Sequence, residues 1–133
     1  MPERPYEKLK FYQDACELRR LIVQITERFE KIHMRLVSQM RDAAHSAKQN
    51  IREGYSRGSL AEFLRAIRIS QGSLEELSGD INDCLEDKLI SSKEHEKLTG
   101  LCKSALYMSS QYVKSMNKSA NKGKWTTPGE NKV

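Results

Sequence analysis

Proline is missing from the whole central part of this chain. The three prolines, Pro2, Pro5 and Pro128, all lie near the ends. Proline breaks a helix interior because it has no N–H to donate and because its ring clashes with the preceding turn. Residues 6–127 can therefore be helical throughout. Hydrophobic residues make up 38% of the sequence and charged residues 31%, which is typical of helices that each carry one apolar stripe.

Apolar residues recur at helical spacing in four segments of the chain. These segments span about residues 6–29, 32–53, 59–85 and 91–118. The connections after the second and third segments are short, so we expect their neighbours to pack antiparallel. The sequence predicts an all-α protein, an antiparallel up-down four-helix bundle over residues 1–118. Residues 29–33 leave one boundary open, because the first two helices could be separated by a turn, bend gently or run on.

Helix boundaries are indicated by short polar patterns. Ser59 with Glu62, and Ser91 with Glu94, are spaced as in a capping box, so helices are expected to start there. Gly54 follows the last predicted turn of the second helix. A glycine in the left-handed conformation is favourable at such a position, so Gly54 is predicted to close this helix.

The second helix has three distinguishable faces at ~100° per residue. One is rich in alanine, at Ala43, Ala44 and Ala47. Small side chains let another helix approach closely and so increase van der Waals contact, which predicts that this face packs inward. The second stripe holds Arg41, His45, Lys48 and Arg52, and the third holds Asp42, Ser46, Gln49, Asn50 and Glu53.

Asn50, Glu53 and Gly54 are interpreted as a structural cluster at the end of the second helix. Their side-chain oxygens are predicted to accept hydrogen bonds from the turn at residues 55–58. A catalytic role would need a nucleophile beside a base, and no such arrangement accompanies them in the sequence.

Gly72 interrupts the predicted third helix, where glycine costs about 1 kcal/mol relative to alanine. A close helix crossing or a local bend would explain this cost. Ser73 is predicted to bond back to the preceding turn or across to another helix. Glu76 is predicted to pair with an arginine of the first or second helix.

The segment from Gln39 to Leu77 resembles the 23S rRNA-intervening-sequence protein family, and the resemblance extends over about residues 9–112. The residues that carry it, called the signature residues below, are Gln39, Ser46, Asn50, Glu53, Gly54, Ser59, Glu62, Gly72, Ser73 and Glu76. The resemblance implies a bacterial four-helix-bundle protein that assembles as a homopentameric ring. It also suggests an accessory role, because distant relatives serve reverse transcriptases of diversity-generating retroelements.

Charge is distributed unevenly along the chain, whose net charge is +5. Residues 1–72 carry 14 Lys and Arg against 9 Asp and Glu, residues 73–113 carry 4 against 8, and residues 114–133 carry 5 against 1. This asymmetry favours either a polyanionic partner or head-to-tail association between copies. The alternative is a set of solvated helix faces that simply differ in sign.

The basic residues are the strongest functional candidates, because phosphate binding needs cations but little exact geometry. Residues 119–133 are predicted to form a flexible, disordered basic tail, whose tryptophan beside lysines could stack on an unpaired base. The predicted nucleic-acid-binding residues are Arg41, Lys48, Arg52, Arg57, Arg65, Arg68, Lys114, Lys118, Lys122, Lys124 and Trp125. A solvated or salt-bridged face is the structural alternative for all of them.

We expect no enzyme activity, no metal and no cofactor. The Glu30/His33 and Asp42/His45 pairs lack the inward-pointing carboxylates that a di-metal bundle site needs. The three cysteines, Cys16, Cys84 and Cys102, lie on apolar stripes and are predicted to be packed, reduced thiols of a cytoplasmic protein. No apolar run is long enough to cross a membrane, and the first residues do not resemble a signal peptide.

Two functional hypotheses follow. The first is a non-enzymatic oligomeric scaffold that binds RNA, DNA or a nucleic-acid-handling partner. The second is a protein-interaction module, such as an accessory subunit of a reverse transcriptase or another enzyme, that makes no direct contact with nucleic acid.

Overall fold

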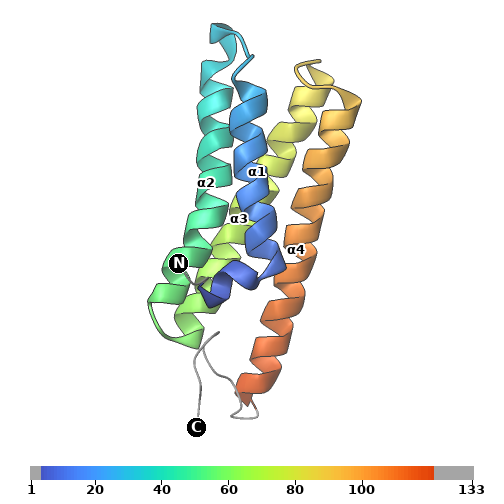
Figure 1. The fold of residues 1–133 in the computed structure, drawn as a ribbon. Coiled ribbons are helices and arrows are strands. Elements are labelled where there is room, and N and C mark those ends of the chain that lie inside the picture. Colours follow the sequence, from blue (N-terminus) through green and yellow to red (C-terminus); the bar gives the residue numbers. More distant parts are fainter. Residues whose placement is uncertain (1–3, 122–133) are drawn as a thin grey trace.

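Four α-helices and two short 3₁₀ turns build the computed structural model, which describes residues 4–121 (Figure 1). In chain order they are η1 (Pro5–Lys8), α1 (Lys10–Thr26), η2 (Lys31–His33), α2 (Met34–Ser56), α3 (Leu60–Glu86) and α4 (Ser92–Asn121). No strand occurs among the described residues. Helix α4 continues three residues beyond its predicted end at Lys118.

Hydrogen bonds between helices fix the topology. Ser46 of α2 is hydrogen-bonded to Ser73 of α3. Gln39, about two turns earlier on α2, is hydrogen-bonded to Asp80, about two turns later on α3. The residue number of the partner on α3 increases as the residue number on α2 decreases, so the two helices are antiparallel. The same reversal holds between α3 and α4 and between α4 and α1. Each helix packs on the next, and α4 returns to α1. The predicted up-down four-helix bundle is confirmed.

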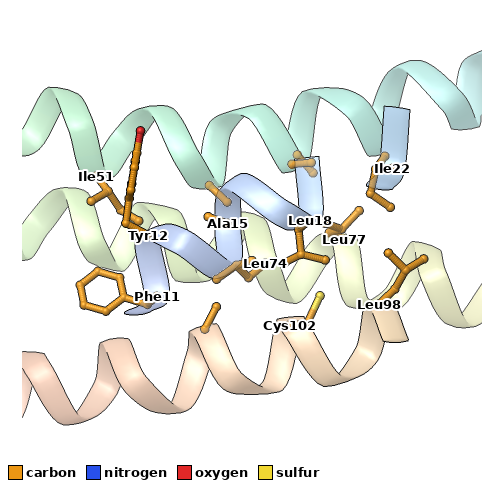
Figure 2. Close-up of a cluster of buried hydrophobic side chains, with 14 of the residues drawn as sticks. Phe11, Tyr12, Ala15, Leu18, Ile22, Ile51, Leu74, Leu77, Leu98 and Cys102 are labelled. Carbon is orange, nitrogen blue, oxygen red and sulfur yellow. The ribbon is translucent and has the colours of Figure 1, made fainter. Parts of the chain in front are cut away.

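Alanines of α2 lie in the core, as the sequence predicted. Ala43, Ala44 and Ala47 are all buried. Figure 2 shows part of the core around them, in which side chains of α1 such as Leu18 meet Leu77 of α3 and residues of α4. The small side chains of α2 leave room for its neighbours to approach.

The start of the first helix differs from the prediction. Instead of one helix over residues 6–29, the chain forms η1 and then turns at Leu9, whose backbone is extended (φ −72°, ψ 129°). This turn brings Tyr6 onto the bundle, where its ring lies 5.0 Å from that of Tyr12 and 5.2 Å from that of Tyr55. Burial of an aromatic ring against two others favours the break over a longer helix.

The first two helices are separated by a turn, which decides the boundary that the sequence left open. Helix α1 ends at Thr26, whose hydroxyl donates to the carbonyl of Ile22 at 2.6 Å. From α2, Arg41 donates to the Thr26 hydroxyl at 3.0 Å and to the Val23 carbonyl at 3.2 Å. The two bonds from Arg41 tie the end of α1 to α2 across the turn.

The predicted left-handed role of Gly54 is wrong. Helix α2 continues through Gly54 to Ser56, and Gly58 adopts the left-handed conformation with φ +82°. Gly54 is instead the point where α3 comes closest, because a Cβ atom there would overlap the Cβ atom of Ala66. The glycine is needed for a close helix contact rather than for a turn.

Of the two explanations offered for Gly72, a close helix crossing or a local bend, the close crossing is wrong. No atom from elsewhere in the described structure lies within 4 Å of the position that a Cβ on Gly72 would occupy. Gly72 is exposed to solvent in the middle of α3. The close crossing therefore occurs 18 residues earlier, at Gly54.

Serine caps begin α3 and α4 as predicted. The Ser59 hydroxyl accepts from the Glu62 amide at 3.2 Å. At α4 the capping box is complete, because the Ser91 hydroxyl accepts from the Glu94 amide at 3.1 Å and the Glu94 carboxylate accepts from the Ser91 amide at 2.9 Å. Arg28, which follows the end of α1, donates to both oxygens of the same carboxylate, at 2.5 and 2.6 Å. The arginine hydrogen bonds lower the pKa of Glu94 to about 2.

The two glycines should respond in opposite directions to alanine substitution. Gly54→Ala should lower the free energy of unfolding by about 1–3 kcal/mol, because the new methyl group overpacks the contact with Ala66. Gly72→Ala should raise it by about 0.5–1 kcal/mol, because alanine stabilises an exposed helix interior. Urea denaturation measures both. Adding Ala66→Gly should reduce the cost of Gly54→Ala, and equal effects at the two glycines would contradict the assigned contact.

The Arg28–Glu94 pair should stabilise the fold in a pH-dependent way. The pKa of Glu94 lies below its ordinary value of 4.5 in the folded state, so the stabilisation is complete above pH 4.5 and is lost as the pH falls towards 2. Arg28→Met should therefore cost about 1 kcal/mol at pH 7, since both side chains are partly exposed. This difference should shrink towards pH 2 in denaturation series, leaving the part that comes from the hydrogen bond between Arg28 and the Leu89 carbonyl. A cost that does not change with pH would contradict the ion pair.

Candidate nucleic-acid interface

Polar signature residues join α2 to α3. The hydroxyls of Ser46 and Ser73 lie 2.8 Å apart, and Ser73 also donates to the carbonyl of Ile69 at 3.3 Å. Both predicted bonds of Ser73, to the preceding turn and across the interface, are thus confirmed. The Gln39 amide donates to the two oxygens of Asp80 at 3.0 and 3.2 Å. These residues hold α2 and α3 in register.

The predicted cluster of acceptors at the end of α2 is wrong in its details. The Asn50 amide donates backwards, to the carbonyl and the hydroxyl of Ser46 at 2.9 and 3.0 Å. The Glu53 carboxylate accepts from Gln49 at 2.5 Å rather than from the following turn. A hydrogen bond does join the turn to Glu53, but it is made to the backbone of Glu53: the Ser56 hydroxyl donates to the Glu53 carbonyl at 2.7 Å.

Sequence reasoning missed two residues of this seam. Ser70 of α3 donates to the backbone carbonyl of Ala47 at 2.6 Å. Asp80 is 7% exposed, and burial raises its pKa although the hydrogen bond from Gln39 opposes the shift. The predicted pairing of Glu76 with an arginine is wrong, because no ion pair within residues 4–121 involves Glu76. For Ser70, the only sequence signal of a bond across the interface was its place as a polar residue within the apolar stripe of a helix.

An aromatic cluster shows which parts of the chain meet at one end of the bundle. The ring of Phe63, near the start of α3, lies 5.9 Å from that of Tyr55, near the end of α2. It lies 5.8 Å from the ring of Tyr112 on α4, which is itself 5.5 Å from Phe11 of α1. The α2–α3 turn, the start of α1 and the last part of α4 therefore share this end (Figure 1).

Most of the predicted nucleic-acid-binding residues gather at this end, which is called the basic end below. They are Lys48, Arg52, Arg57, Arg65, Arg68, Lys114 and Lys118. Residues 46–73 carry five Lys and Arg against two Glu, and residues 105–118 carry two Lys and no acid. In contrast, residues 74–103 carry eight acids against four lysines. Residues 20–45, which share the far end with them, carry five Lys and Arg against three Asp and Glu, so that end holds 11 acids against 9 cations. The charge asymmetry along the chain thus becomes a difference in net charge between the ends of the bundle.

The cations of the basic end are mostly unpaired. The Arg57 guanidinium lies 3.7 Å from the Glu62 carboxylate, and both side chains are partly exposed. None of the other six residues has a carboxylate within ion-pair distance in the described part of the chain. Such groups stay available for phosphate oxygens.

The other predicted binding residues lie elsewhere. Arg41 caps the end of α1 through Thr26 and Val23, near the opposite end of the bundle. Lys122, Lys124 and Trp125 lie outside the described residues, as does most of the predicted tail. Sequence spacing alone grouped Arg41 with Lys48 and Arg52.

The cysteines and histidines are placed separately. Cys84 and Cys102 are buried, and burial raises the pKa of Cys84 to about 11 and that of Cys102 to about 12. Cys16 is only half-buried, but it packs against the edge of the core. Within residues 4–121, no three His, Cys, Asp or Glu side chains are grouped as metal ligands.

None of the described helices combines the length and the apolar content needed to span a bilayer.

A family model described as 23S rRNA-intervening sequence protein matches residues 7–111. The match covers most of the chain and all ten signature residues, so the chain belongs to this family. No curated protein sequence matches it.

Proposed function

We propose that this member of the 23S rRNA-intervening sequence protein family is a non-enzymatic oligomeric scaffold that binds RNA. The observation that carries the proposal is the basic end, where seven Lys and Arg of α2, the α2–α3 turn, α3 and α4 lie in the same half of the bundle. The family's name refers to 23S rRNA, which is consistent with an RNA partner. A nucleic-acid-handling protein bound at the same end is the wider form of this proposal.

The chemistry of the basic end suits a phosphate backbone better than a precise small ligand. Its cations are spread over the ends of three helices, and most have no carboxylate partner. Arg52, Arg68 and Lys114 are exposed. Lys and Arg that neutralise phosphates release counterions, so affinity of this kind falls steeply with salt.

A scaffold role needs no catalytic group. Cys84 and Cys102 stay protonated at neutral pH, because burial raises their pKa values far above 7. A thiol in that state is a poor nucleophile. A cytoplasmic location, with reduced thiols, is part of the proposal.

Self-association would use the polarity of the bundle. An acidic face of α3 and α4 on one copy would meet a basic face of α1 and α2 on the next, a heterologous contact that closes into a ring and leaves the basic end open to RNA. Exposed ion pairs contribute little individually. The exposed apolar residues Ile69, Tyr107 and Met108 supply contact area of the kind that interfaces bury. A ring of five copies is the assembly that the family resemblance implies.

A groove between α1 and α4 favours a second candidate function, a protein-interaction module without nucleic-acid contact. The groove has a volume of about 550 Å³, with Leu21 and Ile25 among its lining residues. Lys93 and Lys97 lie along it. An apolar floor beside lysines suits an amphipathic helix with acidic flanks, such as one from a partner enzyme or a reverse transcriptase.

RNA affinity should depend on salt and on the basic end. A labelled U12 RNA should bind at low ionic strength and weaken steeply from about 50 to 200 mM salt in fluorescence anisotropy titrations. Arg52→Gln combined with Arg68→Gln should weaken binding and reduce the slope of log K against log salt by about 0.7 for each lost phosphate contact. Lys93→Gln combined with Lys97→Gln, an equal charge change in the α1–α4 groove, should have little effect.

Absence of salt-sensitive affinity for RNA or DNA at low ionic strength would contradict this proposal and favour the protein-interaction module. Removing residues 122–133 tests the part assigned to Lys122, Lys124 and Trp125. Lower RNA affinity with an unchanged assembly would support that part.

The assembly should be visible in light scattering coupled to size-exclusion chromatography. We expect a mass of about five times the 15.3 kDa of one chain. Charge contacts between neighbouring copies should make the assembly less stable as salt rises. A single-chain mass at micromolar concentration and low salt would contradict the scaffold proposal.

A further inference from the structure

The two carboxylates of residues 46–73, the α2–α3 part of the basic end, line a single cavity. Among residues 46–73 the only acidic side chains are Glu53 and Glu62. Both line a cavity of about 260 Å³ between the end of α2 and the start of α3. Its other walls include the cations Arg57 and Arg65 and the apolar side chains of Ala66 and Ile69. The acids of this otherwise cationic region are therefore concentrated at one place.

Both carboxylates keep acceptor capacity. One oxygen of Glu53 accepts from Gln49, which leaves the other oxygen free. The 3.7 Å between Arg57 Nη1 and Glu62 Oε2 is too long for a hydrogen bond. No ion pair or hydrogen bond within residues 4–121 involves the side chain of Arg65. The cavity thus offers open acceptors and an open cation together.

This combination excludes the simplest ligands. A free phosphate would be attracted by the arginines but repelled by the carboxylates, and a divalent cation would meet the opposite conflict. The ligand that fits both must present N–H donors to the carboxylates and an anionic group to the arginines. A nucleotide unit has both parts, and 260 Å³ has room for a base.

We propose that this cavity holds one guanine of a single-stranded RNA, an inference that rests on the proposed RNA binding at the basic end. Guanine presents adjacent N1–H and N2–H donors, which match the two oxygens of a carboxylate. Adenine, cytosine and uracil each have only one kind of donor on that edge with acceptors beside it, and none has two adjacent donors, so they cannot make the same pair. The base lies against Ala66 and Ile69, and Arg57 and Arg65 contact its phosphate. Unstacked bases in RNA are recognised in this way.

A guanine preference in binding is the direct test. A U12 RNA and the same RNA with one central guanine are compared by fluorescence anisotropy. The guanine-containing RNA should bind about 5- to 100-fold more tightly, the range of a good bidentate base contact. Glu53→Gln combined with Glu62→Gln should abolish this preference and leave U12 binding equal or stronger, because negative charge is lost. Glu75→Gln combined with Glu86→Gln removes two exposed carboxylates outside the cavity and should leave the preference intact.

Each outcome decides the inference. Equal binding of the two RNAs by the unaltered protein would overturn the guanine site while leaving the proposed RNA binding in place. A preference that survives Glu53→Gln with Glu62→Gln would overturn its location. Failure to bind either RNA would overturn the proposed function and the guanine site together. Thermal unfolding of every variant shows whether a lost preference comes from the cavity or from a damaged fold.

Discussion

The close approach of α2 and α3 is the constraint on which the other features depend. At Gly54 the two backbones come so near that even a methyl group on α2 would strike Ala66. The alanines of α2 and the hydrogen bonds of Ser46, Gln39 and Ser70 continue this contact along the helices. Because close packing of this kind tolerates only one register, it also fixes which charged side chains stand next to one another at the α2–α3 turn.

Features set by local sequence were predictable, and features set by a distant neighbour were not. The serine caps and the alanine face follow from spacing within one helix. Glycines are different, because a glycine at a turn, at a close contact and at an exposed position looks the same in the sequence. Gly54, Gly58 and Gly72 fill these three situations, and only what lies opposite each of them tells them apart. Tyr6 was likewise assigned to the wrong element, because one of the rings it contacts, that of Tyr55, lies on α2.

The same distinction applies to the candidate interface. Residue type and spacing identified the cations, but their grouping required the antiparallel packing of α2, α3 and α4. Arg41 shows the limit of spacing, since it shares a stripe with Lys48 and Arg52 yet is bound to the end of α1. The cavity that holds Glu53 and Glu62 was also invisible in the sequence, because its walls come from two helices whose register depends on Gly54 and Ala66.

The turn at Leu9 has a practical consequence for anyone who handles this protein. It folds η1 across the bundle so that Tyr6 meets Tyr55 beside the α2–α3 turn, and α4 finishes at that same side (Figure 1). An affinity tag or fluorescent fusion attached directly at residue 4 or residue 121 would thus be anchored beside the cationic surface and could crowd it. The α3–α4 connection, around Asp87 and Lys88 at the far side, is the better place to attach a label or to tether the molecule to a support.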